Sequence, residues 1–318
     1  MPSEFDIIKR YFTRPNRHAV LGIGDDAALL APTPGTELVA SADMLVEGTH
    51  FFANAEPKLL GRKTLAVNLS DMAAMGATPR WAMLSAALPG LDSIWIKKFA
   101  KGFFEMADEF AIELIGGDTT RGPLTLSVHI LGEVPKGTAL RRDGAKAGDD
   151  IWVSGSLGDA ALALAHYHSK INLDPKSLSF CASRLHTPTP RVVLGTSLRA
   201  IAHSAIDISD GLLADLNHIL ERSKVAAEIE FSKLPQSVAM QAYAHQAIAQ
   251  HARLAGGDDY ELCFTAAPAS QKKISVLSRQ LNLALTRIGT IKPGKGLKLI
   301  DASGKNMKIP SLGYDHFA

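Results

Sequence analysis

The chain has 318 residues, which is long for a single hydrophobic core, so we expect two domains. Its 46% hydrophobic and 21% charged residues are typical of a globular protein, and a formal charge of +2 gives no bulk attraction for nucleic acids or membranes. Two distant cysteines without metal-ligand spacing, an N-terminus unlike a signal peptide and the lack of a long apolar run favour a cytoplasmic protein.

Helical and strand-like patterns are mixed without strict alternation, which favours an α+β fold over a doubly wound one. In the first half we expect helices over 4–13, 57–76 and 93–110, and strands over 26–30, 38–45, 81–88, 112–115 and 124–134. The Gly-, Lys- and Arg-rich stretch 135–149 is the predicted linker, which puts the domains at 1–137 and 138–318. In the second half we expect helices over 160–168, 212–223 and 271–280, strands over 151–153, 205–208, 227–231, 260–265, 286–291 and 297–300, and an irregular stretch over 175–191.

The helix predicted over 57–76 is apolar on nearly every face, as in a helix buried on all sides. Thr64, Asn68 and Asp71 interrupt this pattern at spacings of four and three, so they share one face. A buried carboxylate is costly unless a charge or a metal meets it. Asp71 is therefore either a structural group, capping a loop or pairing with a core arginine, or a metal ligand supported by Thr64 and Asn68.

Aspartates recur where strands are predicted to end or helices to begin, usually beside glycine. They occur in six motifs: GIGDDAA at 22–28, SAD at 41–43, NLSD at 68–71, IGGDTTRG at 115–122, DISDG at 207–211 and GGDDYE at 256–261. Each motif alone is more typical of a turn or a helix cap, but converging carboxylates would need cations between them. Oxygen donors without Cys pairs or helical His pairs favour magnesium over zinc.

Magnesium completes its shell with waters and substrate phosphates, and the paired glycines at 116–117 and 256–257 would let backbone N–H groups approach such phosphates. This combination predicts phosphoryl transfer from a metal-bound nucleotide. The sequence GIGDDA at 22–27 matches a dinucleotide fingerprint, but its two carboxylates would repel a pyrophosphate. The basic run at 141–146 is either a solvated turn or a phosphate contact, and the aromatic tail 313–317 either docks on the core or covers a ligand.

Taken in order, these motifs resemble those of the thiamine-monophosphate kinase family, a relative of aminoimidazole ribonucleotide synthetase. The resemblance covers nearly the whole chain and rests on the six motifs together with GTHF at 48–51, RRDGAKAGD at 141–149 and GYDHF at 313–317. It implies ATP- and magnesium-dependent phosphorylation of thiamine monophosphate to thiamine diphosphate. It also implies a homodimer whose N-terminal domains pair to form a shared β-barrel-like sheet, with an active site in the cleft between the two domains of each chain.

The resemblance also assigns site residues, position by position. It implies magnesium ligands at Asp26, Ser41, Ala42, Asp43, Asp71, Asp118, Asp207 and Asp210. It implies nucleotide contacts at Gly117, Asp118, Arg142 and Ser209, and substrate contacts at His50, Asp258 and Tyr314. Of these, Asp71, Asp118 and Asp207 are expected to be the residues on which catalysis depends most.

Two positions depart from the family pattern. Position 42 is Ala where relatives often have Thr, so only its backbone carbonyl is able to ligate, and Asp258 replaces a common Glu with a carboxylate one methylene shorter. The alternatives are another ATP-dependent enzyme of the same superfamily and a non-catalytic nucleotide-binding module. A selenophosphate synthetase would need a reactive Cys near the N-terminus, and no Cys precedes Cys181.

Overall fold

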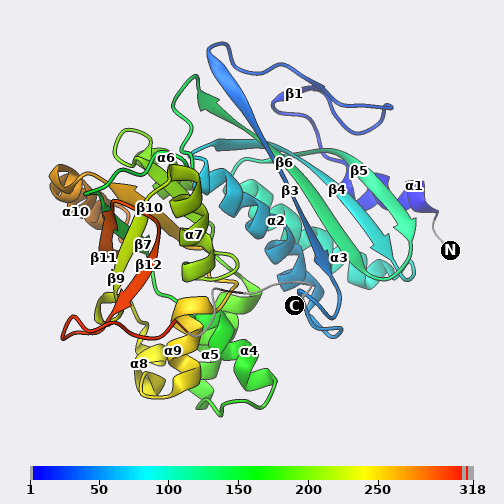
Figure 1. Ribbon diagram of the computed structural model, residues 1–318. Helices are drawn as coiled ribbons and strands as arrows, with labels where there is room; N and C mark the ends of the chain where they lie inside the picture. Colours follow the sequence, from blue (N-terminus) through cyan, green and yellow to red (C-terminus); the bar gives the residue numbers. More distant parts are fainter. Residues whose placement is uncertain (1–2, 310–312, 314–318) are drawn as a thin grey trace. The chain divides into compact units, whose positions relative to one another are not determined.

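The computed structural model describes residues 3–309 and 313, and the chain in it divides into two compact units. The first unit contains residues 1–72 and 77–137, and the second contains residues 73–76 and 138–318. The described helices include none that is long and apolar enough to cross a membrane. Each unit combines helices with a mainly antiparallel sheet, as expected for a two-domain α+β protein (Figure 1).

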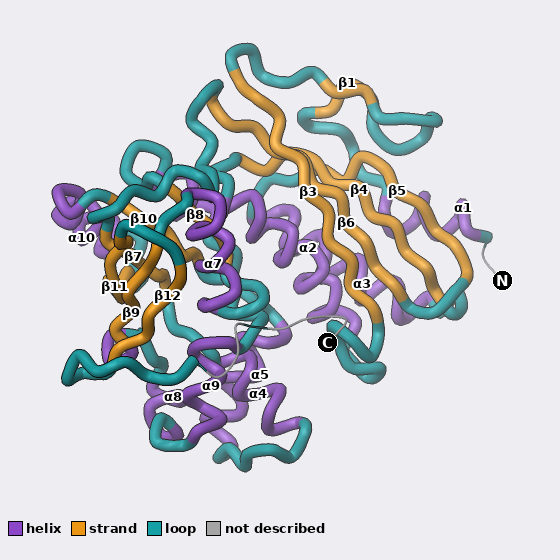
Figure 2. Tube along the Cα trace, in the orientation of Figure 1, coloured by secondary structure: helices purple, strands orange, loops and turns teal. Residues whose placement is uncertain are grey.

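The first unit is built on a four-stranded sheet in the order β3-β6-β4-β5. Only the β4–β5 pair is parallel. Helices α2 and α3 lie on one face of this sheet (Figures 1 and 2). Its elements are α1 (Glu4–Ile7), the π-helix η1 (Ile8–Phe12), β1 (Ala19–Leu21), β2 (Leu29–Leu30), β3 (Thr36–Val46), α2 (Pro57–Ala74), β4 (Thr78–Leu88), α3 (Ser93–Glu109), β5 (Glu113–Arg121) and β6 (Thr125–Pro135). The described residues of this chain form no closed barrel.

Helix α2 confirms the prediction made from its ends and its composition. It begins at Pro57, and a Schellman motif ends it, in which Gly76 (φ +65°) donates its N–H to the Ala73 carbonyl and Ala77 donates to the Met72 carbonyl. The apolar side chains from Leu65 to Ala73 are at most 2% exposed. Helix α3 packs closely against α2 at Gly61. A Cβ at this position would lie 2.1 Å from the carbonyl oxygen of Phe99, so the absence of a side chain at Gly61 permits this close approach.

The second unit contains a six-stranded sheet in the order β12-β9-β11-β7-β10-β8, in which only β12 and β9 are parallel. Ile151, Val153, Ile206 and Ile288 of this sheet are buried with Leu216 of α7 in one core. The strands are β7 (Asp150–Ser154), β8 (Ser204–Asp207), β9 (Ala226–Glu230), β10 (Leu262–Ala266), β11 (Leu285–Lys292) and β12 (Gly296–Ile300). The helices are α4 (Asp159–Tyr167), α5 (Pro175–His186), α6 (Val192–Leu198), α7 (Leu212–Ser223), α8 (Val238–Tyr243), α9 (Ala247–Ala255) and α10 (Gln271–Gln280), with 3₁₀ turns η2 (Phe231–Lys233) and η3 (Pro268–Ser270).

The prediction of an irregular stretch over 175–191 is wrong, because helix α5 occupies most of it. Pro175 is not a breaker here but the first helical residue, and the Asp174 carboxylate caps the helix by accepting the N–H groups of Lys176 and Ser177. The prediction that each aspartate motif lies at a strand end or helix start is also wrong in four cases. Asp43 lies within β3, Asp71 lies near the end of α2, and Asp118 lies within β5, which continues to Arg121. The motif at 256–261 lies between the end of α9 and the start of β10.

Candidate functional site

The carboxylate of Asp71 on α2 accepts a hydrogen bond from the hydroxyl of Ser41 on β3, with 2.5 Å between Oγ and Oδ2. Asp71 is half-buried, whereas its neighbours Ser70 and Met72 are fully buried. Because the apolar side chains of α2 around Asp71 are buried in the core, the helix holds this carboxylate rigidly at the edge of the core. Two of the residues expected to ligate magnesium, Ser41 and Asp71, therefore lie in direct contact.

Asn68 joins the same helix to the same strand one turn earlier. Its Oδ1 accepts the backbone N–H of Asp43 at 3.1 Å, and its Nδ2 donates to the Thr64 carbonyl at 3.0 Å. Asn68 is 1% exposed, so the strand backbone at Asp43 is fixed by a buried amide. Thr64 bonds only within its own helix, to the Leu60 carbonyl, among the hydrogen bonds found. The support expected from Thr64 and Asn68 thus comes from Asn68.

The alternation of β3 separates the three candidate ligands that follow one another along it. Ser41 and Asp43 are half-buried, and Ala42 between them is exposed. Successive side chains of a strand point to opposite faces, so the Ala42 methyl group points away from the face that Ser41 and Asp43 share. A Thr hydroxyl at position 42 would also point away from that face. The replacement of Thr by Ala therefore removes no side-chain oxygen from the Ser41–Asp43 face.

Two glutamates of the sheet hold the ends of the segment that carries Asp26. The carboxylate of Glu113 on β5 accepts the backbone N–H groups of Arg17, His18 and Ala19 at 2.7–2.9 Å. At the other end, Glu133 on β6 accepts the N–H of Thr33 at 2.6 Å and its hydroxyl at 2.9 Å. Both glutamates are at most 7% exposed, while Asp26 is exposed between these anchors.

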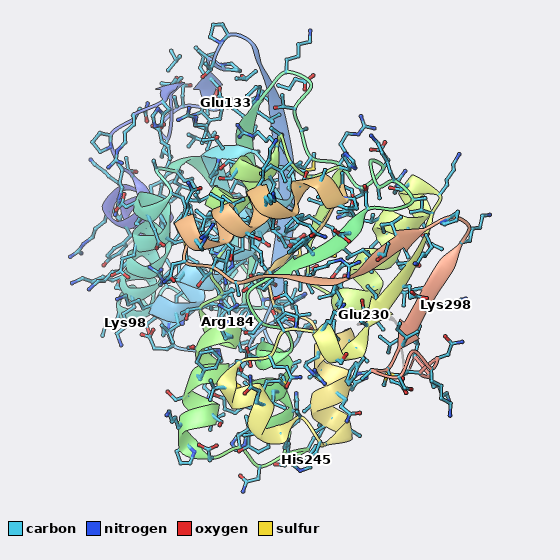
Figure 3. All side chains as sticks on the ribbon, turned by 90° about the vertical axis from the view of Figure 1, so that its left-hand side faces the viewer. Lys98, Glu133, Arg184, Glu230, His245 and Lys298 are labelled. Carbon is cyan, nitrogen blue, oxygen red and sulfur yellow. The ribbon has the colours of Figure 1, made fainter. Side chains whose placement is uncertain are left out.

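Glu133, which is labelled in Figure 3, also forms an ion pair with Arg80, with 3.0 Å between Oε2 of Glu133 and Nε of Arg80. Burial alone would raise the pKa of this carboxyl, but its hydrogen bonds from Thr33 and Arg80 outweigh burial and hold the pKa below the ordinary value of 4.5. Glu133 therefore stays ionised in the fold and serves as an anchor for the segment before β3.

Gly117 and Asp118 lie on β5 beside a cavity of about 1030 Å³ in the first unit. Gly117 has a φ of +149°, and a Cβ there would lie 1.8 Å from the Leu84 carbonyl oxygen, so only glycine fits this approach of β5 to β4. Asp26, Gly117 and Asp118 provide polar groups at the cavity, and its walls are largely apolar. The apolar lining includes Phe12, Ile23, Met83, Trp95, Ile96 and Phe99. A mostly apolar cavity with a few polar groups suits an organic ligand that also carries charge.

His50 follows a turn after β3 in which Gly48 has a φ of +80°. The Nδ1 atom of His50 accepts the backbone N–H of Val46 at 3.0 Å, which places the proton of a neutral imidazole on Nε2. An N–H on Nε2 is the kind of donor that binds a phosphate oxygen. The packing role that is the default for a single histidine and the expected substrate contact are both compatible with this orientation.

In the second unit, Asp207 ends β8 and Asp210 precedes α7, so this motif lies at a strand end and a helix start as predicted. Sequence reasoning missed a third carboxylate here, Asp215 in the first turn of α7, which is 3% exposed. Burial, together with the negative charges of Asp207 and Asp210, raises the pKa of Asp215 from its ordinary value of 3.8 to about 7. Three carboxylates thus lie within electrostatic reach of one another.

The segment 256–261 packs against the Asp207–Gly211 loop. A Cβ on Gly257 would lie 2.5 Å from the Ser209 carbonyl oxygen, so this glycine allows two backbones to meet. Gly256 donates its N–H to the Ala252 carbonyl at the end of α9. The interpretation of Gly256 as a phosphate-binding amide is therefore wrong, since its donor is already used. Asp258 is half-buried and has a φ of +66°, which is rare for a residue with a side chain.

Glu261 anchors this segment to the core of the second unit. Its side chain is fully buried and pairs with the guanidinium groups of Arg184 on α5, marked in Figure 3, and of Arg191. The hydroxyl of Ser154 donates to the same carboxylate at 2.5 Å. Next to it, Asp259 accepts the N–H of Gly158 at 2.9 Å. Glu261 and Asp259 belong to the acidic motif at 256–261, but every contact found for them holds the fold together.

Among the remaining predicted residues, Arg142 is exposed, and no carboxylate in the described ranges pairs with it. Its neighbour Arg141 is held by Asp143 at 2.5 Å, so of the two arginines Arg142 is the one able to reach a phosphate. Tyr314 lies outside the described residues.

Within residues 3–309 and 313, no three His, Cys, Asp or Glu side chains come close enough to hold a metal by themselves. Magnesium bound through one or two carboxylates, water and phosphate still fits the pairs of oxygen donors found in each unit.

Comparison with known proteins identifies the family. The model of the AIR synthase related protein N-terminal domain matches residues 24–134, and that of the C-terminal domain matches residues 146–302. The chain is 42% identical over 320 residues to the thiamine-monophosphate kinase of Escherichia coli K12, covering 99% of this chain and 98% of that protein.

Solved structures agree with this match. The crystal structure of thiamine-monophosphate kinase from Stenotrophomonas maltophilia K279a shares 49% identity with a TM-score of 0.86, covering 95% of each chain. The structure of AaThiL complexed with AMPPCP and TMP shares 31% identity with a TM-score of 0.79, covering 99% of this chain and 97% of that one. Through its match to both AIR synthase related domains and its full-length similarity to these kinases, the chain belongs to the thiamine-monophosphate kinase family.

Proposed function

We propose that this protein transfers the γ-phosphoryl group of ATP to thiamine monophosphate, with the help of several magnesium ions, to give thiamine diphosphate and ADP. The observation that carries this proposal is the full-length similarity to thiamine-monophosphate kinases, which covers 99% of the chain. The complex of AaThiL with AMPPCP and TMP supports the two substrates, because these ligands are an ATP analogue and the phosphate acceptor expected here.

The oxygen donors of the two units would hold the magnesium ions. In the first unit these are Asp26, Ser41, Asp43, Asp71 and Asp118, with the backbone carbonyl of Ala42, and in the second unit Asp207 and Asp210. Bound magnesium would screen the negative charges of the two phosphorylated substrates from each other. That both groups serve one active site in the cleft between the domains stays a prediction from the family resemblance.

The reaction needs no strong general base. A phosphate oxygen of thiamine monophosphate, largely ionised at neutral pH, forms a bond to the γ-phosphorus of ATP while the bond from that phosphorus to the β-phosphate oxygen breaks in line. Here the Nε2–H of His50 is suited to donate to the acceptor phosphate, and the exposed guanidinium of Arg142 is suited to the nucleotide phosphates. Asp258 and Tyr314 are the further substrate contacts we propose, and Gly117 and Ser209 the further nucleotide contacts.

The cavity beside β5 supports a nucleotide-binding role for the first unit. Its volume of about 1030 Å³ and its apolar walls suit a nucleobase and ribose, and Gly117 and Asp118 line the same cavity, which supports their proposed contacts with phosphates and metal. We accordingly propose residues 1–137 as the ATP- and magnesium-binding domain and residues 138–318 as its α+β partner domain.

We also propose that the protein is a homodimer formed through the first unit. On edge strand β3, Leu38 is 48% exposed and Met44 is 56% exposed, and alternation places them on one face. An apolar face of this kind is typical of an interface, and pairing two such sheets would give the shared barrel-like sheet implied by the family. The cytoplasmic location expected from the sequence stays a prediction.

The decisive experiment measures ADP formation by the purified protein with ATP and magnesium, with and without thiamine monophosphate. We expect turnover only when the acceptor is present, with thiamine diphosphate identified by mass spectrometry. ADP formation that requires a different phosphate acceptor would favour another enzyme of the superfamily. Nucleotide binding without any turnover would favour a non-catalytic module.

A further inference from the structure

Asp215 gathers three consecutive backbone N–H groups around one carboxylate oxygen. Its Oδ2 lies 3.1 Å from each of the nitrogens of Ser209, Asp210 and Gly211. The side chain comes from the first turn of α7, whose Cα–Cβ bonds point toward the helix N-terminus and so toward this loop. Consecutive N–H groups arranged in this way form a binding site for an anion, and here the anion is the protein's own carboxylate.

The carbonyl groups of the same loop are also in use inside the second unit. Asp258 donates its N–H to the Ser209 carbonyl at 2.9 Å, and Tyr260 donates to the Ile208 carbonyl at 2.8 Å. The N–H of Ile208 in turn reaches the carbonyl of Glu261 at 2.8 Å. Asp215 therefore holds the N–H groups of residues 209–211, and the segment 258–260 holds the carbonyls of Ile208 and Ser209.

This arrangement limits how the loop is able to bind a ligand. A nucleotide phosphate has no access to the N–H groups at positions 209–211, since Asp215 already occupies them. The oxygen that accepts these three N–H groups likewise has no lone pair left for a cation. The side chains of Ser209 and Asp210 take no part in these backbone contacts, so they are the candidate groups for nucleotide and metal.

We propose that Asp215 is a positioning residue: it fixes the backbone of residues 209–211 so that the Ser209 hydroxyl and the Asp210 carboxylate are held ready for nucleotide and metal, and it contacts neither ligand itself. The inference rests on the proposed function, because that function assigns those roles to Ser209 and Asp210. Residues that orient metal ligands typically cost about 10–100-fold in metal affinity or activity when they are replaced.

The test compares Asp215→Ala and Asp215→Asn with the wild-type protein. The amide oxygen of Asn is able to accept the same N–H groups, whereas Ala leaves them without a buried acceptor. The matched control is Asp301→Ala, since Asp301 also accepts backbone N–H groups, from Ser303 and Lys305, in a turn without candidate ligands. For each variant we would measure kcat, the magnesium concentration for half-maximal rate, the thermal midpoint and, by calorimetry, binding of a non-hydrolysable ATP analogue with magnesium.

We expect Asp215→Ala to weaken the magnesium-dependent binding of the analogue and to lower kcat by about 10–100-fold per folded molecule. Asp215→Asn should recover most of both, and Asp301→Ala should stay within twofold of the wild type. The proposal is overturned if Asp215→Ala binds and turns over like the wild type, if its loss only follows the fraction unfolded, or if Asp215→Asn is as impaired as Asp215→Ala. Failure of the wild type to phosphorylate thiamine monophosphate would instead contradict the proposed function, and the calorimetric comparison would still decide the role of Asp215.

Discussion

Replacing Glu261 by Gln should strongly destabilise the second unit. The carboxylate is 0% exposed, and it accepts hydrogen bonds from Arg184, Arg191 and Ser154. Glutamine keeps the size but removes the charge that these two guanidinium groups share, and its amide N–H₂ faces cations. Breaking a buried ion pair from one side costs about 3–5 kcal/mol. The arginine side chains are 17% and 15% exposed and keep some contact with water, so we expect the lower end, about 3 kcal/mol.

The assay is urea unfolding followed by the fluorescence of Trp152, which lies in the second unit on β7 and stacks on Phe264. A background with Trp81→Phe and Trp95→Phe removes the tryptophans of the first unit, so the signal reports the unit that carries Glu261. With urea slopes of about 2–3 kcal/mol per molar, a loss of about 3 kcal/mol lowers the midpoint by roughly 1–1.5 M.

The control is Glu230→Gln. Figure 3 marks Glu230, whose side chain is 30% exposed and pairs with Lys233 at 2.7 Å. Partly exposed ion pairs contribute less than about 1 kcal/mol, so the control should shift the midpoint by under about 0.5 M. A midpoint for Glu261→Gln as close to the wild type as that of the control would refute the view that this buried group anchors the segment carrying Asp258.

Three further predictions address the first unit. Asp71→Asn should lower turnover by at least about 100-fold with an unchanged thermal midpoint, and activity near that of the wild type would rule out a metal-holding role for Asp71. Met44→Lys should convert a dimer into a monomer in light scattering after gel filtration, because it places a charge on the apolar face of β3, and an unchanged dimer would exclude that face as the interface. Glu133→Gln should destabilise the protein at neutral pH. Because the native pKa of Glu133 lies below the ordinary value of 4.5, its contribution is present above that value and is lost as the pH falls through the native pKa. The stability gap between wild type and Glu133→Gln should therefore close in acid, and a gap that is constant from pH 7 to pH 3 would contradict the anchoring role.

Local patterns in the sequence predicted most of the elements that the structure contains. Pro57 and Gly76 bracket helix α2, and apolar periodicity located β4, β6 and α7 to within a few residues. The failures occurred where local signals conflict with packing. Pro175 resembles a breaker but begins α5, and the glycines at 116–117 resemble a turn but lie in β5, where Gly117 allows close approach to β4.

In the candidate site, too, some residues were identified from the sequence and others only from the packing. The spacing of the aspartate motifs and their family resemblance assigned Asp71, Asp118 and Asp207 from the sequence alone. Nothing in the sequence distinguished these from the acidic residues that hold loops in place, Glu113, Glu133, Asp215 and Glu261. In sequence all are acidic residues near turns or strand ends.

What the sequence by itself determined is therefore the family, most of the helices and strands, and the set of residues able to carry the chemistry. What only the tertiary structure decided is which carboxylates face a ligand and which face the backbone. The N–H groups bound by Glu113 come from residues 94–96 positions away, and the arginines bound by Glu261 from residues 70 and 77 positions away. Such partners are brought together by packing of the core, and the same carboxylate is an anchor when buried donors surround it and a candidate ligand when the fold leaves it at a surface.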